Sequence, residues 1–239
     1  MKRQVSLEDI SDGRLYGKND MVRVGCNDCR GCSSCCSQMG NSVILDPMDI
    51  FRLTVQLSLT FEELMRDRIE LNVVDGVILP NLKMSTGTEV CGFLDDDGRC
   101  SIHPYRPGVC RLFPLGRYYE DAEYACIRDE TAVDRRESRK LPFHYFLQVH
   151  ECPAPCKTKV KVAKWLDTPG LDRYEWFVAD WHWFLEDVQK RLEGETDEGM
   201  KNIDLFILQL FYIRPYDTTR DFYSQFEERM TQAREVLEL

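Results

Sequence analysis

The sequence predicts an α+β protein dominated by helix, with an irregular cysteine-rich metal-binding core, small β-hairpins and a helical C-terminal part. Two observations predict this class. All 11 cysteines lie before residue 157, whereas all four tryptophans follow it. Apolar residues recur at helical spacing after residue 157, while residues 73–102 alternate around Gly-containing turns. We therefore expect a Cys-rich metal-chelating domain at 1–156 and a helical region at 157–239 that packs on it as one compact unit.

Two helices and two hairpins are expected in the first part. Asp46 before Pro47, and Thr60 before an acidic first turn, are helix N-cap signals that predict helices at Pro47–Leu57 and Phe61–Leu71. Residues 73–85 alternate around Asp75-Gly76 and predict a hairpin. The tight turn between Cys91 and Cys100 predicts a second hairpin.

The C-terminal part reads as helices with an aromatic core face. Asp172 is a plausible N-cap and Gly194 a plausible stop, Pro215 ends a later helix, and Thr218 or Thr219 caps the last one. The predicted helices span 174–192, about 200–213 and about 219–237.

Composition and charge exclude several classes of protein. The chain has 239 residues, enough to bury a core without disulfides. Its net charge of −10 argues against a nucleic-acid partner, because such proteins need a cationic surface. Residues 203–213 form the longest apolar stretch, too short to span a membrane, and the N-terminus lacks the apolar run of a secretory signal. We expect a cytoplasmic protein whose cysteines stay reduced and serve metal or redox chemistry.

The strongest signal for chemistry is a run of five cysteines at 26–36. Thiolates two residues apart in a turn can face one metal ion, so C-x2-C recurs in zinc and iron–sulfur sites. Two registers compete: Cys26, Cys29, Cys32 and Cys36 in ferredoxin-like spacing, or Cys29, Cys32, Cys35 and Cys36 as C-x2-C-x2-C-C. Adjacent cysteines diverge and rarely bind one ion together, so ligands from elsewhere are expected.

Downstream cysteines can supply those ligands. Cys91 and Cys100 flank the second predicted hairpin, and Cys110 follows in an Arg-Pro-x2-Cys-Arg turn. We expect their sulfurs to converge with those of the N-terminal run. Arg106 and Arg111 stand where they could offset the charge of a thiolate cluster.

Residues 26–116 contain four motifs in a fixed order: C-x2-C-x2-C-C, C-G-F-L, C-S-I and R-P-x2-C-R-x-F-P. In this ordered set the segment resembles the YkgJ-type cysteine cluster proteins. Those proteins are described as carrying a zinc- or iron-chelating domain. His103 departs from the aromatic residue usual after C-S-I and is expected to be a structural substitute. The resemblance implies a ligand set of Cys29, Cys32, Cys35, Cys36, Cys91, Cys100 and Cys110. We add Cys152, in a Cys-Pro-Ala-Pro-Cys loop, as a further candidate ligand. Cys26, Cys126 and Cys156 are left open as ligands or buried thiols.

The expected function is metal binding without an assigned reaction. No phosphate-binding Gly-rich loop and no G-x-S-x-G motif is present in the sequence. Spacing alone does not separate zinc from iron–sulfur, although the ferredoxin-like run and the vicinal pair favour iron–sulfur. The cluster would be structural or electron-carrying, with a protein partner as a further expectation. Alternatives are a protein-lysine methyltransferase, from a more distant similarity to flagellin lysine-N-methylases, and a thiol redox switch.

Overall fold

The α+β class is confirmed by the computed structural model, which combines helices with small antiparallel sheets. The structure describes residues 6–26, 32–120, 141–154 and 157–239. These divide into two compact units, each assembled from segments distant in the sequence. Unit 1 contains Gly31–Cys110 and Trp181–Leu239, and unit 2 contains Arg3–Arg30 and Arg111–Asp180. The domain boundary expected at residue 156 stays a prediction.

The first helices of unit 1 begin where local capping predicts. Helix α2 (Pro47–Leu57) has the predicted bounds, and Asp46 accepts from the backbone N–H of Asp49 in a capping box. Helix α3 begins as predicted at Phe61, but it ends at Asp67 instead of Leu71. The chain turns there into a strand, because Ile69 pairs with Leu82 across a hairpin.

That hairpin joins β3 (Ile69–Val74) to β4 (Val77–Leu82) and confirms the predicted turn. Asp75 and Gly76 both have positive φ, at 48° and 90°, as a tight two-residue hairpin turn requires. The outer edge of β4 pairs in turn with residues 43–45, because Leu82 N–H donates to the Val43 carbonyl at 3.0 Å. Ile44 thus forms an isolated antiparallel bridge with Asn81 beside the two-stranded sheet.

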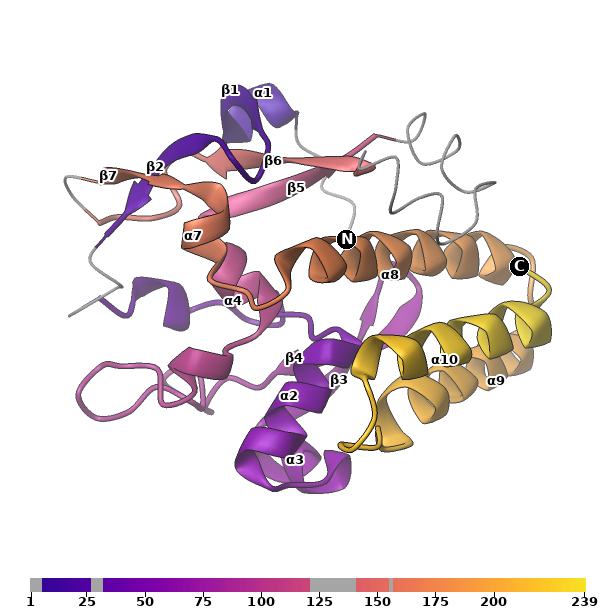
Figure 1. Cartoon of the computed structure of the whole chain (residues 1–239). Helices are drawn as coiled ribbons and strands as arrows, with labels where there is room; N and C mark the ends of the chain where they lie inside the picture. The colour runs from indigo at the N-terminus through magenta and orange to yellow at the C-terminus, as the bar shows by residue number, and fades with distance from the viewer. Residues whose placement is uncertain (1–5, 27–31, 121–140, 155–156) are drawn as a thin grey trace. The chain divides into compact units, whose positions relative to one another are not determined.

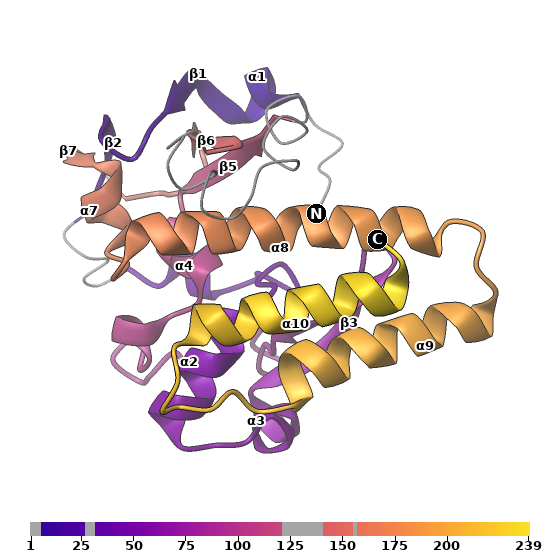
Figure 2. The ribbon, with the colours of Figure 1, turned by 45° about the vertical axis from the view of Figure 1, so that its right-hand side comes forward.

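The C-terminal helices of unit 1 pack around an aromatic core. They are the second half of α8 (Leu171–Leu192), α9 (Asp197–Leu208), the π-helical turn η4 (Gln209–Ile213) and α10 (Phe222–Leu237). The fully buried Phe184 and Phe211 contact Trp181, with ring centroids 5.5 and 5.0 Å away. Figure 2 shows α10 running between α9 and the C-terminal part of α8. Burial of these rings stabilises the helices without any ligand.

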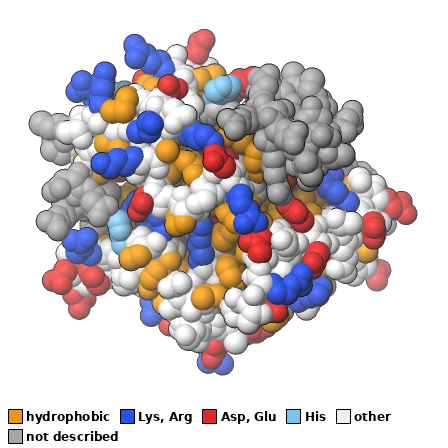
Figure 3. Space-filling view, in the orientation of Figure 1, with side chains coloured by type: hydrophobic (Ala, Val, Ile, Leu, Met, Phe, Trp, Pro, Cys, Tyr) orange, Lys and Arg blue, Asp and Glu red, His pale blue; other side chains and the backbone are white. Residues whose placement is uncertain are grey.

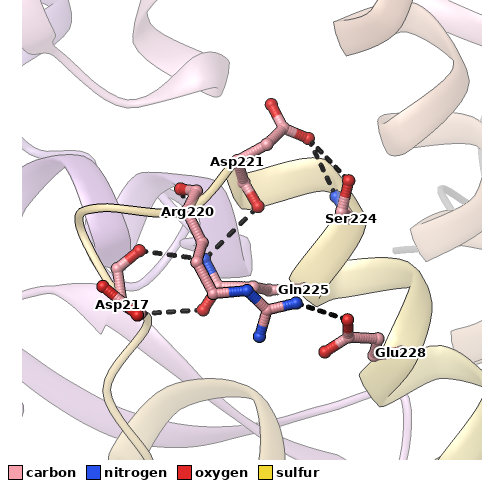
Figure 4. Close-up of polar contacts among 6 residues, drawn as sticks. All are labelled: Asp217, Arg220, Asp221, Ser224, Gln225 and Glu228. Atoms are coloured by element: carbon pink, nitrogen blue, oxygen red, sulfur yellow. Dashed lines mark hydrogen bonds and ion pairs between the residues drawn. The ribbon is translucent and has the colours of Figure 1, made fainter.

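The predicted ends of these helices need small corrections. Asp172 lies in the first turn of α8 and is not its N-cap, because the helix already includes Leu171. The last helix is capped by Asp221, which accepts from Ser224 N–H at 3.0 Å, and not by Thr218 or Thr219. Figure 4 shows this cap beside the turn in which Asp217 and Gln225 exchange hydrogen bonds.

A buried arginine closes the end of the π-helical turn. Arg229 of α10 donates to the carbonyls of Leu210, Arg214 and Pro215 at 2.6–2.8 Å, and its guanidinium stacks 3.6 Å from the Tyr216 ring centroid. Carbonyls at a helix C-terminus lack intrahelical donors, so a buried cation there satisfies them.

Unit 2 is built on a three-stranded antiparallel sheet in the order β1-β6-β5, visible in Figure 1. Its strands are β1 (Ser11–Tyr16), β5 (Leu115–Tyr119) and β6 (Phe143–Gln148), and a second pair joins β2 (Met21–Gly25) to β7 (Thr158–Lys161). Its helices are α1 (Leu7–Ile10), α7 (Val162–Leu166) and the first half of α8. The fully buried Glu175 of α8 accepts from Lys18 at 3.1 Å and from the hydroxyl of Tyr145 at 2.9 Å. No helix in the described ranges is long and apolar enough to cross a membrane.

Candidate metal centre

The vicinal cysteines of unit 1 lie on a single tight turn. Ser34–Cys36 forms a 3-10 turn, η2, in which Cys36 N–H donates to the Ser33 carbonyl at 2.8 Å. The Cys35 and Cys36 side chains are hydrogen-bonded to each other. Both remain partly exposed to solvent.

Cys91 is placed against this turn by backbone pairing. Its N–H donates to the Cys36 carbonyl at 2.7 Å, and Gln38 N–H donates to the Glu89 carbonyl at 2.7 Å. On the other side, Ser85 N–H donates to the Val90 carbonyl at 2.8 Å. The segment 89–91 therefore lies between 36–38 and 83–85, although about fifty residues of chain separate Cys36 from Cys91.

Cys100 faces the same region through the second predicted hairpin, which the structure confirms. Leu94 and Cys100 form an antiparallel bridge, and Asp95 N–H donates to the Arg99 carbonyl at 2.8 Å. Gly98 takes a positive φ of 72° in the turn. The acidic triplet Asp95–Asp97 thus serves turn geometry.

Cys110 sits in a short helix held by a buried carboxylate. Helix α4 (Gly108–Leu112) starts where Gly108 N–H donates to Oδ1 of Asp49 at 2.9 Å. Asp49 is only 2% exposed, and burial raises its pKa well above the usual value. Through this bond α2 fixes the position of the Cys110 turn.

Five thiols from these turns act electrostatically on one another. They are Cys35, Cys36, Cys91, Cys100 and Cys110. The hydrogen bond between the vicinal sulfurs lowers the pKa of Cys35 to about 6 and raises that of Cys36. Burial raises the pKa of Cys91, Cys100 and Cys110. The negative charge of the Cys35 thiolate raises the pKa of each of them further.

Cations and amide donors face these sulfurs. The positive charge of Arg106 helps to lower the pKa of Cys35, and Arg106 and Arg68 partly offset the burial that raises the pKa of Cys100 and Cys91. Backbone N–H groups two residues onward also donate to two sulfurs, Phe93 to Cys91 and Ile102 to Cys100. Such donors stabilise thiolate, the form of cysteine that binds metal.

Arginine placement is only partly as expected. Arg106 meets the thiols, and its guanidinium donates to Nε2 of His103 at 2.9 Å, so this histidine positions the cation. Arg111, the other expected cation, is buried in unit 2 and donates to the Asp167 carbonyl at 2.9 Å. Sequence reasoning missed Arg68, the residue directly after α3, which donates to the Gly92 carbonyl and lies over the Phe93 ring.

The other expected ligands are not brought to these five thiols by any described contact. Cys32 lies before the 3-10 turn and its sulfur is 3.6 Å from the Ser34 hydroxyl. Cys152 and Cys26 belong to unit 2, where the Cys152 carbonyl accepts from Lys157. Cys29, Cys126 and Cys156 lie outside the described residues.

The donor chemistry of this cysteine cluster fits zinc or iron. Soft sulfur donors come from three turns and are flanked by two arginines and by amide donors, the environment that thiolate–metal sites use. Among the described residues, no three His, Cys, Asp or Glu side chains stand close enough as drawn to hold one ion. The fit therefore rests on the chemistry of the donors and on the backbone pairing of their turns, and not on a completed coordination shell.

Comparison with known proteins bears on the same segment. Residues 28–128 match one family model, CxxCxxCC, described as "Putative zinc- or iron-chelating domain". No curated protein and no solved structure matches the chain. The match covers the vicinal pair, both hairpin cysteines and the Cys110 turn. Residues 28–128 of this chain are therefore similar to the CxxCxxCC family of zinc- or iron-chelating domains.

Proposed function

We propose that the protein binds zinc or an iron–sulfur cluster through Cys35, Cys36, Cys91, Cys100 and Cys110. The observation that carries the proposal is the backbone pairing that places Cys91 against the Cys36 turn, with Cys100 across the adjoining hairpin bridge. The family description supports chelation of zinc or iron. Cys29, Cys32 and Cys152 stay predicted ligands that rest on the sequence.

Each neighbouring group has a distinct part in the proposed site. Arg106 and Arg68 offset the negative charge of several thiolates that would otherwise repel one another. The amides of Phe93 and Ile102 fix the direction of the Cys91 and Cys100 sulfurs. A bound zinc ion would supply structural cross-linking, and a cluster would also supply electron transfer.

Of the two candidates, a zinc ion and an iron–sulfur cluster, we propose the iron–sulfur cluster. A vicinal pair cannot easily direct both sulfurs to one ion, so a centre with more than one metal atom suits Cys35 and Cys36 better. The cations beside the thiols support the same choice, because an all-thiolate cluster carries negative charge.

The test is purification without oxygen, followed by metal analysis and a visible spectrum. We expect a brown protein that contains iron and sulfide. Cys91→Ser and Cys100→Ser should lose most of the metal, whereas Val236→Ala, an exposed position on α10 that is not a candidate ligand, should keep it. A colourless protein with stoichiometric zinc would overturn the choice of metal. Unchanged metal in both serine variants would overturn the site.

A thiol redox switch is the second candidate, favoured by the vicinal pair. Cys35, with a pKa of about 6, is mainly thiolate at neutral pH and therefore nucleophilic. Its sulfur would attack hydrogen peroxide and form a sulfenic acid while one oxygen leaves as water or hydroxide. The Cys36 sulfur would then displace the second oxygen as water, leaving a disulfide two electrons more oxidised than the dithiol. Peptide mass mapping after peroxide treatment tests this, with Cys36→Ser as the variant that should stop at sulfenic acid.

The remaining expectations rest on the sequence alone. Lysine methyl transfer, a cytoplasmic location and a protein partner stay predictions. Metal analysis does not test them.

A further inference from the structure

A cationic sheet face in unit 2 is independent of the cysteine cluster. Strand β2, strand β7 and helix α7 contain no carboxylate, although the chain as a whole carries a net charge of −10. The face consists of Arg23, Lys159 and Lys161, with Lys157 and Lys164 beside it. Figure 3 shows Lys and Arg side chains gathered over β2 and β7, at the upper left.

The strand register puts these side chains on one side of the pair. Arg23 lies directly opposite Lys159, and Met21 lies opposite Lys161. Directly opposite residues share a face, and residues two apart along a strand return to it. Val22 and Val24 fill the other face and are buried. Met21, 53% exposed, therefore stands among the cations.

This arrangement costs stability in the absence of an anion. Like charges directly opposite each other in a sheet repel, and Arg23 faces Lys159. Within the described residues, no carboxylate forms an ion pair with Arg23, Lys159, Lys161 or Lys164. A ligand with negative groups would remove the repulsion.

We propose that this cationic face binds an extended acidic segment of a partner protein. Acidic side chains at every second position of an extended peptide repeat at about 6.6 Å, the same spacing as Lys159 and Lys161 on a strand. In the described part of the chain, β2 and β7 pair only with each other, so each strand has an outer edge where a further strand can add. Met21 would contact an apolar residue of the added segment.

Charge and size favour a peptide over other polyanions. A duplex or an anionic bilayer extends far beyond two strands of five and four residues, and would meet the acidic remainder of a chain of net charge −10. A short segment senses only charges within a Debye length of about 8 Å at physiological salt.

The experiment measures fluorescence anisotropy of a labelled peptide of alternating Glu and Thr with the full chain, and of a Gln-for-Glu peptide as control. We expect salt-sensitive binding of the Glu peptide only. Lys159→Glu/Lys161→Glu should weaken it about tenfold or more. Lys201→Glu/Arg66→Glu, the matched charge change on exposed residues of α9 and α3, should weaken it less than about twofold.

Three outcomes would overturn the proposal. Equal loss in both double variants would assign the effect to total charge. Binding of the Gln peptide as tight as that of the Glu peptide would remove the role of the carboxylates. Tighter binding of single-stranded DNA or phosphatidylserine vesicles, abolished by Lys159→Glu/Lys161→Glu, would assign the face to nucleic acid or membrane. Circular dichroism checks that the Lys159→Glu/Lys161→Glu variant is folded. We expect its Tm to be unchanged or raised, because Lys159→Glu puts an acid opposite Arg23.

Discussion

In the C-terminal helices of unit 1, the rings of Trp181, Phe184, Phe211 and Phe226 fill a buried core. In the cysteine turns of the same unit, every described cysteine is only partly buried, and short backbone ladders connect the turns. The helices obtain their cohesion from apolar burial. The turns bury fewer apolar side chains, Phe93 and Ile102 among them, and bring together sulfurs that repel as thiolates. Two neighbouring regions of one unit thus depend on different sources of stability, and each of the following predictions tests that difference.

Metal removal should have the largest effect. Because few apolar side chains hold the cysteine turns and their thiolates repel one another, chelation under reducing conditions should cost several kcal/mol there and loosen residues 33–38 and 89–110. The helices at 181–237 should keep their protection. Hydrogen exchange with mass spectrometry, before and after chelation, measures both regions in one sample. Equal change in the two regions, or none in the turns, would contradict the comparison.

Phe211→Ala should act on the helices. Phe211 is fully buried and contacts Trp181, Phe184 and Phe226, so truncation should lower the free energy of unfolding by about 3–5 kcal/mol. Urea denaturation followed by tryptophan fluorescence measures it. The bound metal per folded molecule should not change, and Leu205→Ala, an exposed position on α9, is the control. A loss below about 1 kcal/mol would show that the aromatic core is not the main support of the helices.

Asp49→Ala should weaken the link between α2 and the Cys110 turn. It leaves Gly108 N–H without its acceptor in a buried place, at a cost of about 1–3 kcal/mol. Asp49→Asn keeps an acceptor oxygen and should cost less. Exchange of the Gly108 amide and metal affinity are the readouts. Protection of that amide in Asp49→Ala equal to wild type would remove Asp49 from the support of the site.

A smaller, pH-dependent effect should come from Asp204 of α9, which is buried and accepts from Ile78 N–H at 3.2 Å. Burial raises the pKa of Asp204 above its ordinary value of 3.8. The folded state therefore holds this proton more tightly, so stability falls as pH rises from 3.8 through the raised pKa. The loss is about 1.4 kcal/mol for each unit by which the pKa is raised. Asp204→Asn should flatten that part of the stability–pH curve, and an unchanged slope would assign the dependence to another group.

Local signals predicted the elements that depend on local chemistry. The caps of α2 and the Asp75-Gly76 turn act within a few residues, so sequence alone placed them. The end of α3 was wrong because pairing of Ile69 with Leu82 overrides helix propensity. In the sheet β1-β6-β5, strand β1 pairs with β6 although more than a hundred residues separate them. No local sequence pattern predicts such pairing.

The candidate site shows the same division. The hairpin between Cys91 and Cys100 was predictable from its turn residues. Arg68 and Asp49 were not, because Arg68 follows α3 and Asp49 binds the Gly108 amide from α2, and neither belongs to a cysteine motif. An acidic residue at the third position of a capped helix reads as part of the cap, and Asp49 has that role as well.

The hydrogen bond between Asp49 and Gly108 also bears on the order in which the chain assembles. It joins residues 59 apart, and closing a flexible loop of that length costs about 3–4 kcal/mol of chain entropy. Because the bond involves no cysteine, docking of α2 against the start of α4 can meet this cost without a metal. Once this bond has formed, metal binding by the cysteines closes shorter loops than it would in a free chain. The intact chain should therefore bind its metal more tightly than a peptide that carries the same cysteines without α2.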